Sequence, residues 1–244
     1  MIMNYSPIVT LDVDWAPDFM IDYASELLTK QGIHATWFIT HDSPSIQKLS
    51  NNKLFEIGLH PNFDQNSTQG DDFHSILSNL KSIAPNAKSI RMHNLLQSTP
   101  ILKMLPQFEI ENECSLMLEK NYTLQPFFSK FFNLFRFPFI WADDVAMADN
   151  FNWTKSFFEI SSSLQILNFH PVHIFLNSNN TLKYELAKSE VGINNLNENN
   201  VEKYVNTTEP GTQTFFKILL EQLSNEKTYT ILELQHILKS EKHG

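Results

Sequence analysis

Polar side chains capable of metal binding and proton transfer recur in this sequence at the ends of short apolar runs. They are Asp12, Asp14, His60, Arg91, His93 and His170. Two carboxylates held close together repel each other unless a cation lies beside them, and neutral imidazoles are common metal ligands. A carboxylate that does not bind the cation is available as a base. The combination predicts a divalent metal site with a neighbouring base.

The composition limits which donors such a site can use. Cys114 is the single cysteine, so the chain can form neither an intramolecular disulfide nor a Cys-rich zinc site. The 18 Lys and Arg against 27 Asp and Glu give a net charge of −9, which argues against a nucleic-acid partner. We find no apolar stretch of the ~20 residues that a membrane span requires, and no signal-peptide pattern at the start. We therefore expect a cytoplasmic protein whose metal is held by His and carboxylate.

Expected strands and helices alternate along the chain and would bring these residues together. Strands are expected at 7–13, 35–39, 54–59, 89–93, 108–110, near 134–137 and at 164–169, with amphipathic helices between the early ones. This alternation predicts an α/β fold with a parallel sheet, in which the carboxyl ends of the strands meet on one face. The last helix is expected to begin at Thr230, where Glu233 completes a capping box.

We expect a single catalytic domain over residues 1–244, because the chain has no internal repeat and no convincing linker and α/β barrels commonly reach about 250 residues. The stretch 177–210 is rich in Asn, Glu and Lys, and we interpret it as a loop-rich excursion that could serve as a lid or be partly disordered.

Strand geometry adds a further expectation. Side chains two positions apart on a strand point to the same side, so Asp12 and Asp14 should share a face, as should Arg91 and His93. Each residue also has a structural explanation: Asp14 could cap the following loop, for example. The coincidence of such residues at four strand ends favours a functional site. The other histidines at strand starts, in helices or at the tail receive no role; they are His34, His41, His74, His236 and His243.

In their order along the chain, these motifs resemble the polysaccharide deacetylase family, carbohydrate esterase family 4, with the NodB-homology fold. Thr10–Pro17 resembles its opening motif with a close Asp pair, and 35–39 its second strand. Glu56-Ile-Gly-Leu-His60 is similar to its metal-binding motif. Arg91-Met-His93 lies where the family has an arginine motif, and 167–171 resembles its final histidine motif.

The resemblance extends over residues 7–173 and implies a distorted (β/α) barrel of about seven parallel strands. It also implies a divalent metal ion, usually zinc, and removal of acetyl groups from sugars. The roles that follow are metal ligation by Asp14, His60 and His93, general-base catalysis by Asp12, pairing of Arg91 with Asp12, and protonation of the leaving amine by His170.

Two departures from the family pattern concern the metal site. Val13 separates two aspartates that are commonly adjacent, and Asp64 stands where the family has its second metal-binding histidine. The third ligand is therefore either Asp64 or His93. We prefer His93, because it follows Arg91 by two residues and should lie on the same strand face. The His-Pro-Asn-Phe and Arg-x-His motifs resemble a divergent branch associated with surface polysaccharide biosynthesis.

The resulting hypothesis is a metal-dependent deacetylase that acts on N-acetyl groups of an amino sugar in surface polysaccharide biosynthesis. Its partner would be an acetylated sugar or polysaccharide precursor, and its cofactor a divalent ion such as zinc. One alternative is hydrolysis of another C–N bond, for example in a formamide. Another is an inactive carbohydrate-binding barrel, which the missing second histidine would suit.

Overall fold

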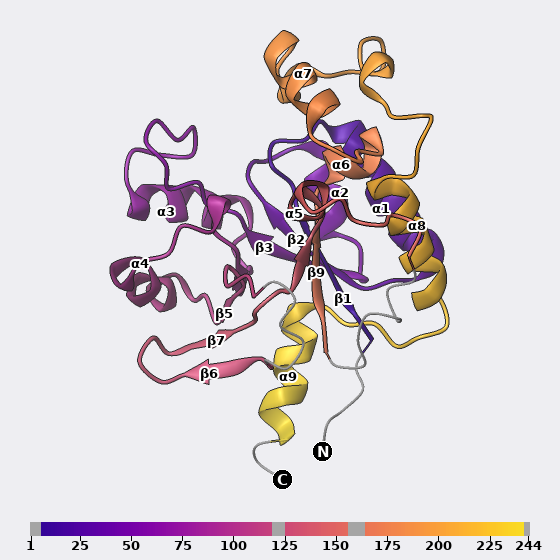
Figure 1. Ribbon diagram of the computed structural model, residues 1–244. Helices are drawn as coiled ribbons and strands as arrows, with labels where there is room; N and C mark the ends of the chain where they lie inside the picture. Colours follow the sequence, from indigo (N-terminus) through magenta and orange to yellow (C-terminus); the bar gives the residue numbers. More distant parts are fainter. Residues whose placement is uncertain (1–5, 119–124, 156–163, 242–244) are drawn as a thin grey trace.

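The computed structural model describes residues 6–118, 125–155 and 164–241. Nine strands form one sheet in the order β6-β7-β5-β4-β3-β2-β1-β9-β8 (Figure 1). The strands are β1 (Ile8–Asp12), β2 (Ala35–Ile39), β3 (Phe55–Leu59), β4 (Ser89–Ile90), β5 (Asn112–Glu113), β6 (Phe127–Ser129), β7 (Leu134–Arg136), β8 (Trp141–Ala142) and β9 (Ile166–Phe169). All neighbours pair in parallel except β6 and β7. The expected α/β fold with a parallel sheet is confirmed, with nine strands rather than about seven.

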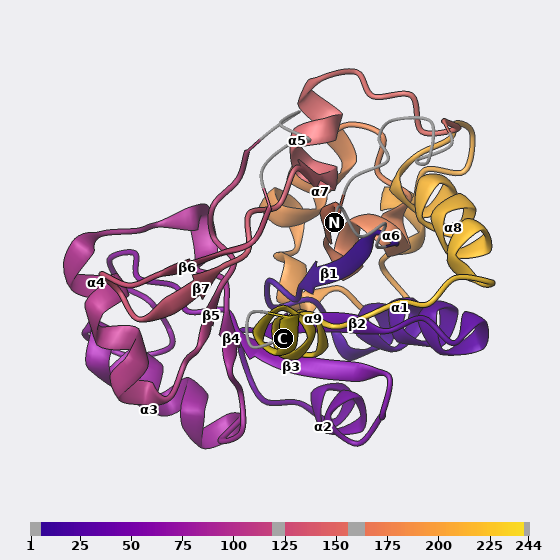
Figure 2. The same ribbon diagram turned by 90° about the horizontal axis from the view of Figure 1, so that it is seen from below.

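Helices cover the outer face of this sheet, and one helix fills the lower end of its curl. They are α1 (Asp18–Gln31), α2 (Pro44–Ser50), α3 (Phe73–Ile83), α4 (Thr99–Met104), α5 (Asp143–Ala148), α6 (Pro171–Leu176), α7 (Leu182–Glu190), α8 (Thr212–Leu223) and α9 (Ile231–Glu241). Seen from below, the sheet curls around α9 (Figure 2). Ile231 and Leu234 of α9 are buried in one apolar cluster with Phe38 and Phe137. Because α9 fills the lower end of the curl, a site open to solvent is left to the upper end.

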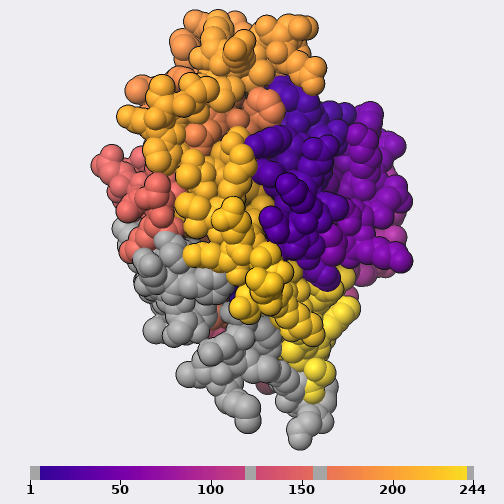
Figure 3. Space-filling model, turned by 90° about the vertical axis from the view of Figure 1, so that its right-hand side faces the viewer, coloured from indigo at the N-terminus to yellow at the C-terminus, as the bar shows by residue number. Residues whose placement is uncertain are grey.

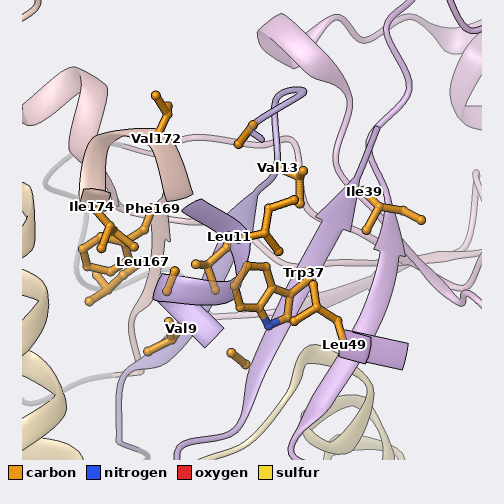
Figure 4. Close-up of a cluster of buried hydrophobic side chains, with 14 of the residues drawn as sticks. Val9, Leu11, Val13, Trp37, Ile39, Leu49, Leu167, Phe169, Val172 and Ile174 are labelled. Carbon is orange, nitrogen blue, oxygen red and sulfur yellow. The ribbon is translucent and has the colours of Figure 1, made fainter. Parts of the chain in front are cut away.

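Alternate side chains of β1 lie on opposite faces of the sheet, one face in the apolar core and the other at the polar site. Val9 and Leu11 belong to the outer core, where Figure 4 shows them beside Trp37. The alternate residue Thr10 and the strand's last residue, Asp12, are buried and form hydrogen bonds on the inner side. Successive side chains of a strand point to opposite faces, so one five-residue strand supplies both the core and a carboxylate at the upper end of the sheet.

Two strand predictions in the middle of the chain were wrong in their bounds. The run 108–110 is not a strand: a 3-10 turn covers Leu105–Phe108, Glu109 adopts a left-handed φ of 57°, and β5 begins only at Asn112. The run 89–93 ends as a strand at Ile90, and His93 opens a 3-10 turn. Apolar periodicity indicates which residues are buried, but Ile110 and Met92 are buried here without being part of a strand.

The segment 177–210 contains α7 and two 3-10 turns, Ile193–Asn195 and Glu202–Tyr204. In Figure 1 α7 lies above the upper ends of the central strands, and in Figure 3 this segment forms one end of the molecule, above α8. The capping box before α9 is confirmed by reciprocal hydrogen bonds between Thr230 and Glu233. No helix within the described ranges is long and apolar enough to cross a membrane.

Gly58 of β3 is a position where the curl of the sheet leaves no room for a side chain. A Cβ atom there would lie 2.7 Å from the Phe38 ring and 2.9 Å from the carbonyl oxygen of Ser89. We expect Gly58→Ala to lower the free energy of unfolding by about 1–3 kcal/mol, the usual cost of overpacking a core. Urea denaturation measures this change, and a variant as stable as the wild type would contradict the close approach.

Candidate active site

The polar residues that follow the central strands meet at the upper end of the sheet. Asp12 ends β1, His60 follows β3, Arg91 follows β4 and His170 follows β9. All four are buried, with Arg91 fully inaccessible. Because these strands are parallel, their carboxyl ends lie at one edge, where α/β proteins build their binding sites.

Asp12 is held through both of its carboxylate oxygens. Arg91 donates from Nη1 to Oδ1 at 3.0 Å, and Asn168 donates from Nδ2 to Oδ2 at 2.8 Å. The guanidinium itself lies between the rings of Phe38 and Phe139, at 4.5 and 4.6 Å from their centroids. A charge-assisted hydrogen bond such as that from Arg91 fixes the orientation of a carboxylate. Asp12 is thus a rigidly placed carboxylate at the floor of the site.

Asp14 lies beyond the end of β1, so it does not reach the site through the strand alternation that was expected to give it a shared face with Asp12. The strand ends at Asp12, and both Asp14 and Trp15 adopt left-handed backbone conformations, with φ of 45° and 55°. Such values are uncommon for residues other than glycine and cost energy that the surrounding structure must offset. The turn directs the Asp14 carboxylate toward His60 and His93 instead.

Asp14, His60 and His93 form a compact group of potential metal ligands. Oδ1 of Asp14 lies 3.0 Å from Nε2 of His60 and 3.1 Å from Nδ1 of His93, and these two nitrogens are 3.3 Å apart. Ligand atoms roughly 2.0–2.2 Å from a tetrahedral zinc ion are about 3.3 Å from one another. The spacing and the donor types therefore fit a divalent ion held by one carboxylate oxygen and two imidazole nitrogens.

Contacts outside this group orient the ligand atoms. Nδ1 of His60 lies 2.7 Å from the backbone carbonyl oxygen of Arg91, which makes Nδ1 the proton-bearing nitrogen and leaves Nε2 free to coordinate. When no cation is bound, Nε2 of His60 and Nδ1 of His93 can carry protons that face Asp14; burial opposes ionisation of Asp14, but hydrogen bonds from His60 and His93 then outweigh it and hold the pKa of Asp14 well below its usual value. The group is thus suited to present a carboxylate and two imidazoles to a cation.

His170 lies on another side of Asp14, paired with the buried Asp143. Its Nδ1 is 2.6 Å from Oδ1 of Asp143, and its backbone N–H donates to Oδ2 of the same residue at 2.8 Å. Nε2 then faces the site, 3.6 Å from Oδ2 of Asp14. Burial disfavours the charged imidazolium, but the Asp143 carboxylate outweighs burial and raises the pKa of His170 well above its usual value. The arrangement presents an oriented N–H group to the site.

Comparison with known proteins identifies the family of this chain. A profile of WbmS-like polysaccharide deacetylases matches residues 9–188. The chain belongs to this family. A comparison with curated protein sequences gives no match.

Solved structures agree with this assignment. A candidate polysaccharide deacetylase of Bordetella bronchiseptica, WbmS, involved in O-antigen biosynthesis, is 30% identical, with a TM-score of 0.81 over 90% of this chain and 91% of its own. A candidate polysaccharide deacetylase of Mycobacterium smegmatis has a TM-score of 0.63 at 12% identity, over 99% of this chain and 92% of its own, and shares the fold. The resemblance to polysaccharide deacetylases and the NodB-type fold expected from the sequence are confirmed.

Asp64 lies outside the ligand group in this WbmS-like chain. Its side chain is exposed and accepts a hydrogen bond from Nδ2 of Asn94 at 2.7 Å. It is not a member of the compact group that contains His93. Of the two candidates for the third ligand, the structure therefore brings His93 to Asp14 and His60. His93 reaches them from a 3-10 turn rather than from the strand face on which the preference rested.

A cleft of about 760 Å³ opens above these residues, and a smaller hollow of about 100 Å³ leads down to Asp12. The cleft is lined by Asp14, His93 and His170 from the strand ends, and by Tyr184 and Lys188 from α7. The excursion 177–210 therefore forms part of the wall of the site in this WbmS-like protein. Asparagine and threonine side chains also line it, and such groups hydrogen-bond to sugar hydroxyls; they are Asn62, Asn66, Thr68, Asn94, Thr181 and Asn194.

Two residues of the site, Asn168 and Asp143, were not found from the sequence. Asn168 precedes His170 by two residues, so the strand alternation used for Asp12 and Asp14 could have indicated it. Asp143 follows β8, a two-residue strand with no recognisable pattern. A metal group of Asp143, Asp144 and His170 is also geometrically possible. We interpret it as an aspartate–histidine pair, because both Asp143 oxygens already bind His170.

The pairing of Asp143 with His170 leads to a testable expectation for this deacetylase-family chain. Asp143→Asn preserves size but removes the charge that holds the imidazole in its orientation and protonation state. We expect about a hundredfold loss of kcat, within the range that an acid–base group contributes, with bound metal unchanged. Acetate release and elemental analysis measure the two quantities.

The matched control is Asp71→Asn, an exposed aspartate that precedes α3. It should retain wild-type activity. If Asp143→Asn released acetate at the wild-type rate, Asp143 would have only a structural role.

Proposed function

We propose that this protein is a metal-dependent deacetylase that hydrolyses the N-acetyl group of an amino sugar during surface polysaccharide biosynthesis. The observation that carries the proposal is the placement of three chemical groups around one cleft. These are the carboxylate of Asp12, the Asp14–His60–His93 group, and the Nε2 atom of His170. A base, a cation site and an acid are the groups that hydrolysis of an unactivated amide requires.

Asp14, His60 and His93 would hold the ion, and zinc is the proposed metal because one carboxylate and two imidazoles suit it. A bound divalent ion would lower the pKa of a water molecule and polarise the acetyl carbonyl. The remaining steps belong to side chains of the protein.

Asp12 accepts the proton of the attacking water as the new C–O bond forms at the acetyl carbon. Its oxygens are held by Arg91 and Asn168, so it need not reorient during the reaction. His170 donates its Nε2 proton to the amide nitrogen as the C–N bond breaks, and Asp143 stabilises the imidazolium that donates it. The products are acetate and a free amino sugar.

The substrate class is supported by the cleft and by the family. Amide and hydroxyl side chains line the cleft. The Bordetella bronchiseptica relative is described as involved in O-antigen biosynthesis. An acetylated sugar or polysaccharide precursor is accordingly the proposed partner.

The experiment is acetate release from N-acetylated glycans by the zinc-loaded protein, with N-formylated analogues in parallel. We expect acetate release to exceed formate release. Faster formate release would favour the alternative C–N hydrolase. Absence of both products, together with less than about a tenth of an equivalent of bound metal, would favour the inactive carbohydrate-binding barrel.

A further inference from the structure

Helix α7 contributes to the cleft although it carries none of the strand-end motifs. It lies above the sheet, and its residues Tyr184, Glu185 and Lys188 line the cleft together with Asp14 and His170. None of these three takes part in the proposed proton transfers. Residues of α7 that line the cleft but do not react are well placed to bind the part of the substrate that lies away from the acetyl group.

Tyr184 places an aromatic ring and a free hydroxyl group beside the site. Its ring packs edge to face against His173 at 4.7 Å, and the His173 ring lies 5.5 Å from that of His170. The hydroxyl makes no hydrogen bond with any residue in the described ranges, and burial, with a smaller effect of Asp14, raises the pKa of Tyr184 to about 12. Tyr184 is therefore a neutral donor with a ring face that is only partly covered.

Lys188 lies one helical turn beyond Tyr184, on the same face of α7. Its Nζ atom is 5.9 Å from the centroid of the Tyr184 ring. Among the residues lining the cleft in the described structure it is the one Lys or Arg. No acidic oxygen of the described residues lies within 4.0 Å of it, although Glu185 lines the same cleft. The ammonium group is therefore available to a ligand.

We propose that Tyr184 and Lys188 form a subsite that binds an amino sugar bearing an anionic group, either a carboxylate or a phosphate. This inference rests on the proposed function, because it concerns how the same cleft selects its substrate. The sugar ring packs on Tyr184 and accepts a hydrogen bond from its hydroxyl. Its anionic group pairs with Lys188, in a charge-assisted hydrogen bond of the kind that adds specificity.

The test is calorimetric titration of the zinc-loaded full-length protein with three matched probes. They are N-acetylglucosamine, its uronic acid and its 1-phosphate. We expect one of the charged sugars to bind about tenfold more tightly than the neutral one, as a hydrogen bond to a charged group provides. Lys188→Met should remove this preference. Tyr184→Phe should lower the affinity for all three probes by a similar factor. Tighter binding of the uronic acid would identify an amino sugar with a carboxylate as the substrate class. Tighter binding of the 1-phosphate would identify a sugar phosphate.

The control is Lys53→Met, which makes the same charge change at an exposed position outside the cleft and should retain the preference. Anion binding by the metal itself would survive Lys188→Met. A wild-type protein without any preference, or a preference that Lys188→Met leaves intact, would therefore overturn the inference. Acetate release is measured separately, so a protein that showed the Lys188-dependent preference without hydrolysis would contradict the proposed function alone.

Discussion

Replacing Asp12 with asparagine is expected to abolish turnover while metal remains bound. Asp12 is outside the Asp14–His60–His93 group, so its loss removes no ligand. An asparagine fits the same space, but its amide cannot accept a proton from water. We expect kcat to fall by about 10²–10⁴-fold, the usual contribution of a general base. Acetate release gives the rate, and elemental analysis gives the metal content.

The matched control for Asp12→Asn is Asp64→Asn, a second aspartate near the cleft whose side chain is exposed. It should keep most of the activity. If Asp12→Asn kept more than about a tenth of the wild-type activity, Asp12 would not be the general base.

The second large effect concerns the identity of the third metal ligand. His93→Ala removes a nitrogen that lies 3.1 Å from Asp14 and 3.3 Å from His60. We expect metal affinity to fall by more than the roughly 10–100-fold that loss of an outer-shell partner costs, and activity to fall with it. Competition with a chelating dye measures the affinity.

Asp64→Ala is the decisive comparison, because Asp64 stands where the family has its second histidine. Its carboxylate bonds to Asn94 rather than to the ligand group, so metal affinity should stay close to that of the wild type. The reverse result, with metal lost in Asp64→Ala and retained in His93→Ala, would assign Asp64 as the ligand.

Much of the fold could be predicted because apolar periodicity and turn chemistry are local properties. The strands at Ala35–Ile39 and Leu134–Arg136, and the capping box at Thr230, lie where the sequence places them. Two-residue strands such as β8 were missed, since so short a segment has no period to detect. The run 108–110 was mistaken for a strand because apolar Phe108 and Ile110 alternate with a polar residue, although Phe108 ends a 3-10 turn and Ile110 is buried outside any strand.

Composition and strand order were enough to predict the chemical types at the site. With one cysteine in the chain, the donors had to be imidazoles and carboxylates, and the rule that parallel strands end together selected Asp12, His60, Arg91 and His170. These inferences hold because residue identity and strand direction do not depend on the details of packing.

The different contacts of the two aspartates could not be predicted without the folded structure. Asp12 ends β1 and pairs with Arg91, whereas the chain leaves the strand before Asp14, and a left-handed turn there brings the Asp14 carboxylate to the imidazoles. Folding of the chain also brings Asp143 to His170, which lies 27 residues further along, and places α7 at the cleft. Such contacts depend on how distant segments pack, and no local pattern in the chain encodes that.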